Sequence, residues 1–240
     1  MFMHPTPFEQ IVDERLAAGL GGRWYGVYPA LVTSIADPEG QGRVKISLPW
    51  SPDAKSERYD VWARIATLMA GNNRGSWFIP DVDDEVLIAF EGGDVRRPCV
   101  LGGMWNGADA PPESMDSSEH NFLKVLRSRN GVKITLDDQD GQEKCIIETP
   151  GGQKITLKDG PGSIEIMDSS GNSAKFEPSG ITFNSSGTFT LNATTVTISA
   201  GSITANTGTA TFSGMVVASG CVQTPSVIAA SYTPGAGNIW

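Results

Sequence analysis

Residues 178–214 read PSGITFNSSGTFTLNATTVTISAGSITANTGTATFSG, and this stretch decides the fold of the second half of the chain. Apolar residues alternate with small polar ones in five dyads, namely Ile181 and Phe183, Phe189 and Leu191, Val196 and Ile198, Ile203 and Ala205, and Ala210 and Phe212. Alternation at period two places one set of side chains on one face of a β-strand. The dyads recur at steps of eight, seven, seven and seven residues. This spacing predicts a β-solenoid, in which short strands wind about one axis.

A single chain of this kind lacks a core, because each predicted strand offers only two or three inward apolar residues. Burial contributes about 25 cal/mol per Å² of apolar surface, so one exposed ribbon gains little against the entropy of ordering it. Several copies that bury the same face against one another would be stable and would leave no open sheet edge. The residues predicted to face inward are Ile181, Phe183, Phe189, Leu191, Val196, Ile198, Ile203 and Phe212.

The same region carries no charge, since all 27 acidic and 18 basic residues lie before Pro178, as do both histidines. Moving a charge into lipid costs about 2.5 kcal/mol or more, so one interpretation is that this composition eases insertion into a membrane. The other is that the turns of a β-solenoid simply favour Thr, Ser, Asn and Gly. The composition alone supports both.

The first half of the chain has the composition of a globular domain, because every Trp except Trp240 lies before residue 110. Five strand patterns follow one another within about eighty residues, at 25–36, 43–48, 59–68, 85–90 and 99–104. Such a series suits a small Greek-key barrel of the oligonucleotide/oligosaccharide-binding (OB) type. The predicted fold is therefore all-β, an OB-type barrel followed by a β-solenoid that several copies build together.

The predicted organisation has four parts. Residues 1–22 form a capped helix and linker, residues 23–107 the barrel, residues 108–130 a linker rich in Pro, Asp and Ser, and residues 131–240 the repeat region. The repeat begins early, because GVKITLD at 131–137 is echoed by GQKITLKD at 152–159.

The N-terminal helix is predicted from a capping box, in which Thr6 is followed by Pro at the first helical position and by Glu9 at the third. The side chains on its apolar face are Phe8, Ile11, Val12 and Leu16. This face either packs on its own domain or docks on a neighbouring subunit, and the sequence fits both.

Charge and hydropathy exclude several function classes. The net charge is -9 and the pI about 4.7, without a basic stripe for nucleic acid. Residues 1–15 fit neither a signal peptide nor a spanning helix. The apolar runs of the uncharged region, such as 215–218, are far shorter than the ~20 residues that a spanning helix needs. We therefore expect a protein without a signal peptide that binds no nucleic acid.

No residue pattern predicts catalysis, a cofactor or a metal site. The acidic cluster at 81–85 lacks the ligand spacing of a calcium loop, and His4 and His120 lack a nucleophile nearby. Arg96 and Arg97 fit a loop pair better than an anion site. The three widely spaced cysteines, Cys99, Cys145 and Cys221, are expected to be free thiols.

Five motifs in order carry a resemblance to a known family. They are GSWFIP at 75–80, DEVLIAFE at 84–91, GD at 93–94, PCVLGG at 98–103 and WNG at 105–107. The series resembles the barrel domain of phage baseplate assembly protein V, the central spike of contractile tails, and of the related valine-glycine repeat spikes of type VI secretion. One departure is Asp83, where the family often has Gly before the DEV motif.

The resemblance implies a homotrimer in which three barrels form a collar and three chains wind into one triple-stranded β-helix. The collar would sit on the hub protein at the end of the tail tube among other baseplate proteins. The spike would pierce the target envelope when the sheath contracts, with transient membrane contact. The particle would be assembled in the cytoplasm of the producing cell, as a phage tail or an extracellular contractile particle. The lysozyme domain of longer relatives has no room between Asn106 and Gly131.

The resemblance also bears on the tip. Some short phage spikes bind iron at the tip through His-x-His pairs, which this chain lacks at its C-terminal end. A separate PAAR-type tip protein would then contact Asn238, Ile239 and Trp240, with three Trp240 rings as an apolar platform. The alternative is a disordered tail with an isolated Trp.

Two other functions stay open on the sequence. One is a trimeric tail fibre or adhesin whose barrel binds carbohydrate. The other is a barrel that binds single-stranded nucleic acid, which the acidic balance opposes.

Overall fold

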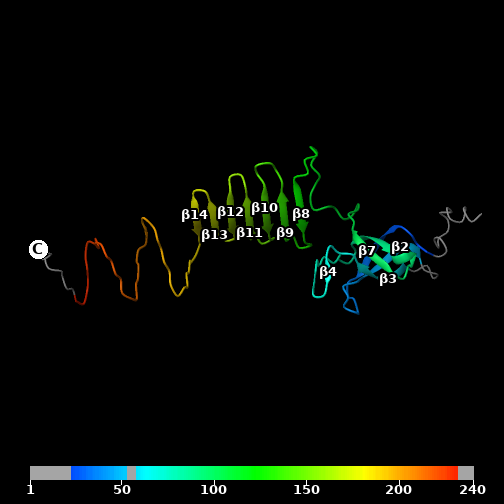
Figure 1. The fold of residues 1–240 in the computed structure, drawn as a ribbon, viewed down its shortest axis with the longest axis horizontal. Coiled ribbons are helices and arrows are strands. Elements are labelled where there is room, and N and C mark those ends of the chain that lie inside the picture. The colour runs from blue at the N-terminus through cyan, green and yellow to red at the C-terminus, as the bar shows by residue number, and fades with distance from the viewer. Residues whose placement is uncertain (1–22, 53–57, 232–240) are drawn as a thin grey trace, which may run out of the picture. The chain divides into compact units, whose positions relative to one another are not determined.

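The computed structural model describes residues 23–52 and 58–231, and these residues form an all-β chain (Figure 1). The chain divides into two compact units, Met1–Thr188 and Phe189–Trp240. Within the described ranges there is no α-helix, and one short 3-10 helix, η1 (Glu91–Gly93), follows β6. The predicted N-terminal helix and the predicted tip residues 238–240 lie outside the described residues.

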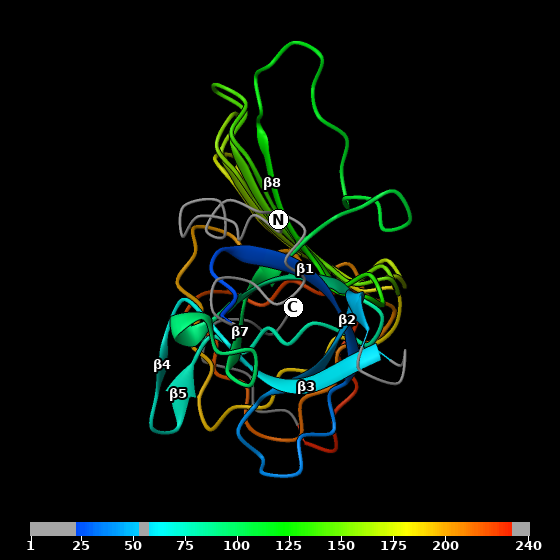
Figure 2. The ribbon, with the colours of Figure 1, turned by 90° about the vertical axis from the view of Figure 1, so that its right-hand side faces the viewer.

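Five strands close into a barrel in the order β1-β2-β3-β7-β6, which confirms the predicted barrel. Their bounds are β1 (Val27–Ser34), β2 (Val44–Pro52), β3 (Arg58–Ile65), β6 (Glu85–Phe90) and β7 (Pro98–Gly103). All neighbours are antiparallel except β3 and β7, which pair in parallel. Figure 2 shows β1, β2, β3 and β7 arranged around the barrel.

The barrel core follows from alternation along its strands. In β6 every second residue is buried, and in β2 the buried apolar residues Val44, Ile46 and Leu48 are those that the sequence places on one face. A closed barrel turns one face of each strand inward, so alternating residues fill it. The buried apolar residues are Ala30, Val32, Val44, Ile46, Leu48, Ala63, Val86, Ile88, Phe90 and Val100.

The connection between β3 and β6 contains a hairpin that the sequence analysis did not predict. It pairs β4 (Ala70–Gly71) with β5 (Arg74–Gly75) through a two-residue turn, Asn72–Asn73. Asn73 has φ +52°, a left-handed conformation that Asn tolerates and that suits a tight hairpin. The predicted strand 59–68 therefore ends at Ile65, because the chain turns away into this hairpin.

Seven short strands form a second sheet, an antiparallel meander in sequence order. Its strands are β8 (Leu123–Arg127), β9 (Lys133–Asp137), β10 (Lys144–Glu148), β11 (Lys154–Lys158), β12 (Ser163–Met167), β13 (Ser173–Glu177) and β14 (Gly180–Asn184). Figure 1 shows them side by side as a ladder. The sheet begins with β8, inside the range 108–130 predicted as a linker. β8 belongs to the sheet because it pairs along its whole length with β9, a partner that the linker's composition did not reveal.

The second unit contains no strand within residues 189–231. Of the five apolar dyads, Ile181 and Phe183 lie in β14, whereas the other four lie in this segment, whose described residues form no strand. We call residues 189–231 the C-terminal segment. Among the described residues there is also no helix long and apolar enough to cross a membrane.

Candidate functional site

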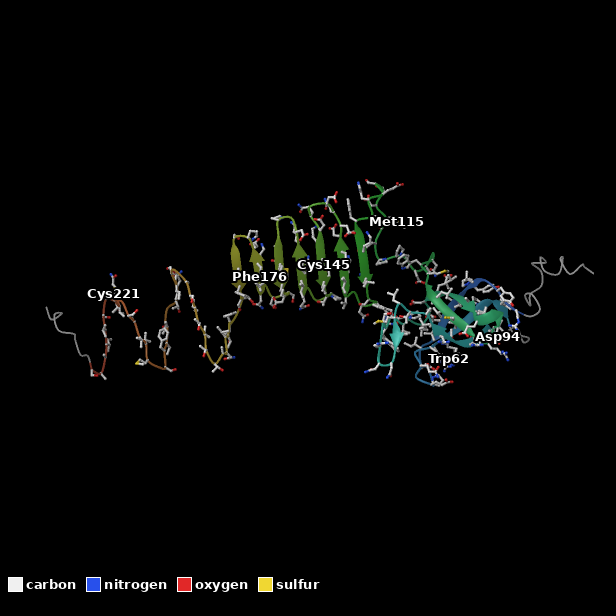
Figure 3. The ribbon with its side chains drawn as sticks, viewed as in Figure 1. Trp62, Asp94, Met115, Cys145, Phe176 and Cys221 are labelled. Carbon is white, nitrogen blue, oxygen red and sulfur yellow. The ribbon has the colours of Figure 1, made fainter. Side chains whose placement is uncertain are left out.

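The second sheet has one apolar face, and its strand register defines that face. In antiparallel strands, residues that lie opposite each other point to the same side. Cys145 lies opposite both Leu136 and Leu157, and Ile155 lies opposite both Ile147 and Ile166. Following the register through all seven strands gives the apolar face: Leu126, Ile134, Leu136, Cys145, Ile147, Ile155, Leu157, Ile164, Ile166, Ala174, Phe176, Ile181 and Phe183. The register also places one charged residue, Lys124 on the first strand, on this side of the sheet, opposite Leu136. Figure 3 labels Cys145 and Phe176 on it.

This apolar face is uncovered in the single chain. Its large aliphatic and aromatic side chains are between 37% and 61% exposed. Phe176 and Phe183 contact each other edge to face, with ring centroids 6.4 Å apart, but both still face solvent. A contiguous apolar surface of this size is uncommon on a soluble monomer and is typical of an interface.

The opposite face of the same sheet carries charge. Lys144 contacts Asp137 across the β9–β10 pair at 3.3 Å, and Lys175 contacts Glu177 along β13 at 2.8 Å. The lysine Lys175 also lies opposite Glu165 on β12. Because charged side chains remain in water unless they are fully paired, this face is the one suited to solvent.

The C-terminal segment continues the exposed apolar pattern. The predicted inward residues in it are between 53% and 71% exposed, namely Phe189, Leu191, Val196, Ile198, Ile203 and Phe212. No backbone-to-backbone hydrogen bond is formed among the described residues 190–231. The hydrogen bonds within this part are local turn contacts, such as Thr207 Oγ1 to the Thr209 carbonyl at 3.0 Å and Thr224 Oγ1 to the Ser226 carbonyl at 3.0 Å.

A chain of side-chain hydrogen bonds holds the point where the backbone leaves the sheet. Asn172 Oδ1 accepts hydrogen bonds from the Ser186 backbone N–H at 2.9 Å and from its hydroxyl at 3.2 Å. The Asn172 amide in turn donates to Asp168 Oδ2 at 2.7 Å, and this contact, first among its causes, lowers the pKa of Asp168. The turn between β12 and β13 thus fixes the exit of the chain after β14.

The sequence analysis located only one end of this site. Ile181 and Phe183 lie on the apolar face, and the structure adds the eleven residues before them. The signal for the missed residues was present in the echo of GVKITLD and GQKITLKD, where Ile134 and Ile155 hold the same place. That signal is weaker because alternate positions hold Lys, Thr and Asp, which belong to the charged face.

Two Arg–Asp ion pairs stabilise loops of the barrel. The Arg43 guanidinium donates to Asp37 Oδ1 at 2.7 Å and holds the pKa of that carboxyl well below its usual range. Arg96 does the same for Asp94, with Nη2 2.8 Å from Oδ2. Each pair joins residues of one loop, and Arg96 lies in a loop as predicted.

The remaining residues singled out in the sequence are the acidic cluster at 81–85 and the three cysteines. In the acidic cluster, Asp84 Oδ2 accepts a hydrogen bond from the Asp81 backbone N–H at 2.8 Å, which closes a turn. Over residues 23–52 and 58–231, no group of three or more His, Cys, Asp or Glu side chains is placed to hold a metal. Cys99, Cys145 and Cys221 are all free thiols.

Comparison with known families gives two matches. Residues 28–105 match the type VI secretion system/phage-baseplate injector OB domain, which is the barrel. Residues 144–209 match the phage baseplate V C-terminal trimerisation domain. The second range covers β10–β14 and the start of the C-terminal segment, so it contains most of the apolar face. The match supports a homotrimer.

Individual relatives include type VI secretion system spike proteins. The chain is 28% identical over 130 residues to spike protein VgrG3 of Vibrio cholerae, covering 49% of this chain and 13% of that protein. It is 29% identical over 138 residues to spike protein VgrG1b of Pseudomonas aeruginosa, covering 52% of this chain and 19% of that protein. The actin cross-linking toxin VgrG1 of Vibrio cholerae matches at 28% over 130 residues, 12% of its length. The chain thus corresponds to less than a fifth of each of these relatives.

The two matched ranges cover more than half of the chain, and they coincide with a closed five-stranded barrel and with a sheet that leaves an apolar face uncovered. The chain therefore carries, in this order, a type VI secretion system/phage-baseplate injector OB domain and a phage baseplate V C-terminal trimerisation domain.

Proposed function

We propose that this protein is the central spike of a contractile injection particle and acts as a homotrimer. The observation that carries the proposal is the uncovered apolar face, which lies largely within the matched trimerisation domain. Three copies that turn this face toward a common axis would build the core that one chain lacks. Complete burial of each Leu, Ile or Phe side chain would contribute about 1.5–3 kcal/mol.

The C-terminal segment would gain its backbone hydrogen bonds from the other copies of the chain. Residues 123–184 pair their strands within one chain, whereas residues 190–231 form no backbone hydrogen bonds with one another. Backbone N–H and C=O groups that become buried must be paired. We therefore propose that these residues pair strand to strand with the other two copies, and that Ile198 and the other predicted inward residues face the shared axis.

The mechanical role follows from this arrangement. A trimer whose backbone groups are paired by neighbouring strands resists local unfolding, because no sheet edge is left free. Such a body would transmit the force of sheath contraction to a small area of the target envelope. Its lack of charge after Glu177 lowers the cost of contact with lipid. This role requires neither catalysis nor a cofactor.

The remaining partners are proposed from the family and not from contacts. The barrels would sit on the hub protein at the end of the tail tube, next to other baseplate proteins. A PAAR-type protein would cover the C-terminal end through Asn238, Ile239 and Trp240. Assembly would take place in the producing cell, before the particle is released or used.

The deciding experiment is the mass of the purified protein by light scattering. The proposal expects about three times the chain mass of 25.5 kDa. A monomer at micromolar concentration would contradict it, because the apolar face would then stay in water.

A further inference from the structure

The barrel carries an open groove that shares no residue with the apolar face of the second sheet. Its volume is about 710 Å³, within the range of ligand pockets. One wall is the β1–β2 loop at Gly40–Gly42, and the other is the connection from Thr67 to Ile79, which includes the β4–β5 hairpin. Figure 2 shows that hairpin standing outside the barrel strands. In OB-type barrels the β1–β2 loop is one of the usual ligand-binding elements.

Two aromatic rings line the groove and face solvent. Trp77 is 76% exposed and Phe78 is 72% exposed, although barrel proteins usually bury such side chains. The Trp77 ring rests on the β1–β2 loop, since a Cβ added at Gly42 would lie 3.1 Å from it. Gly42 has φ +72°, so this position favours glycine for its backbone as well as for the close approach. The ring is therefore held in place while most of it stays open.

The polar groups in the groove divide into two sets. The first set braces the wall, because Thr67 Oγ1 donates to the Ser76 carbonyl at 2.8 Å and the Ser76 backbone N–H donates to the Met69 carbonyl at 2.9 Å. The second set is available to a ligand. The Asn73 amide and the Arg74 guanidinium line the groove, are exposed, and bond to no other described residue. An amide and a guanidinium beside open aromatic rings offer planar donors and acceptors next to apolar surfaces.

We propose that this groove binds a neutral β-linked oligosaccharide, such as a β-1,4 chain of N-acetylglucosamine or of glucose. A pyranose ring in a β-linked chain presents an apolar C–H face, which stacks on an aromatic ring, and a rim of hydroxyls, which bond to amide and guanidinium groups. The groove has both features on a braced wall. This inference does not depend on the spike function, because it concerns the barrel and not the trimer face.

Two other occupants fit the groove less well. A nucleic acid would need several cations to neutralise its phosphates, and the lining contains one, Arg74, in a chain of net charge -9. A peptide added as a strand would need a free sheet edge, and β4 and β5 are two residues long.

The test is calorimetric titration of the full-length protein, in its assembled form, with six-unit β-1,4 oligomers of N-acetylglucosamine and of glucose. Binding of at least one oligomer is expected, with affinity lowered at least tenfold in Trp77→Ala and in Arg74→Ala. The matched control is Trp105→Ala, because Trp105 is 68% exposed but does not line the groove, and this variant should bind as the parent does. Unchanged melting temperatures would show that the variants fold.

Three outcomes would overturn the proposal. One is that the parent binds neither oligomer. Another is that a twelve-unit oligothymidylate binds in place of the sugars, with strong salt dependence. The third is that Trp77→Ala lowers the mass of the assembly and that the parent binds neither sugar. This result would show that the groove is a contact between copies of the chain.

Discussion

At the scale of single residues, Asp83 occupies a backbone conformation that glycine takes most easily. Its φ is +76°, and its N–H donates to the Val32 carbonyl at 2.8 Å just before β6 begins. The left-handed region costs an L-residue roughly 1–2 kcal/mol, though Asp tolerates it better than most. This geometry agrees with the Gly that the family resemblance implies at this position, and Asp is among the residues that can replace it.

The effect of an Asp83 substitution on the stability of the barrel should therefore depend on how well the new residue tolerates a positive φ. We predict that Asp83→Val lowers the stability of the barrel by about 1–2 kcal/mol, because a β-branched side chain clashes most there. Asp83→Gly, the matched control, should be neutral or stabilising. Thermal unfolding of the two variants measures the difference, and equal melting temperatures would contradict it.

The Asp37–Arg43 ion pair should make the stability of the barrel fall at acidic pH. Hydrogen bonds from Arg43 hold the pKa of Asp37 below its usual range, so the folded barrel favours the carboxylate. The resulting stability is fully present above the unfolded pKa of about 3.9 and is lost as the pH falls below that value toward the folded pKa. Asp37→Asn should melt lower at pH 7 and lose less of its remaining stability between pH 5 and pH 2 than the parent. Parallel curves for the two proteins across that range would show that the pair is not responsible.

At the scale of elements, the two faces of one strand should respond oppositely to a charge. In β11, Leu157 lies on the apolar face opposite Cys145 and Ile164, whereas Thr156 lies on the charged face opposite Glu165. We predict that Leu157→Lys prevents trimer formation, because three buried ammonium groups would each cost several kcal/mol. Thr156→Lys should leave the mass unchanged, since it meets a carboxylate in water. If both variants have the parent's mass by light scattering, the apolar face is not the interface.

The elements also show what the sequence could and could not predict. The barrel strands were predictable because alternation such as Val44, Ile46 and Leu48 is enforced by a core within one chain. The β4–β5 hairpin was not, since two-residue strands carry no period. Strand β8 was missed because the stretch rich in Pro, Asp and Ser that precedes it extends the predicted linker to residue 130.

The candidate site was predicted only in part, for a physical reason. From Ile181 on, small polar residues separate the apolar ones and the period stands out, whereas from Leu126 to Phe176 charged residues occupy many of the alternate positions. The groove beside Trp77 carries no periodic signal, because it is formed by two loops that only folding brings together.

At the scale of the whole molecule, the C-terminal segment should be stable only in the assembly. We predict that Ile198→Asp removes its resistance to heat and to a protease of broad specificity, because three carboxylates would meet near the axis. The matched variant Thr197→Asp should have a mild effect, since alternation directs this side chain outward. Fragment masses after digestion report the result, and an Ile198→Asp protein as resistant as its parent would show that Ile198 does not face inward.

The unpaired backbone of residues 190–231 has a genetic consequence. If each copy supplies the bonding partners of the other two, a single faulty copy spoils the entire spike. In a cell that expresses normal and faulty genes together, the fraction of trimers with three normal chains would equal the cube of the fraction of normal chains. Faults in this segment should therefore be dominant, whereas faults confined to one barrel should not.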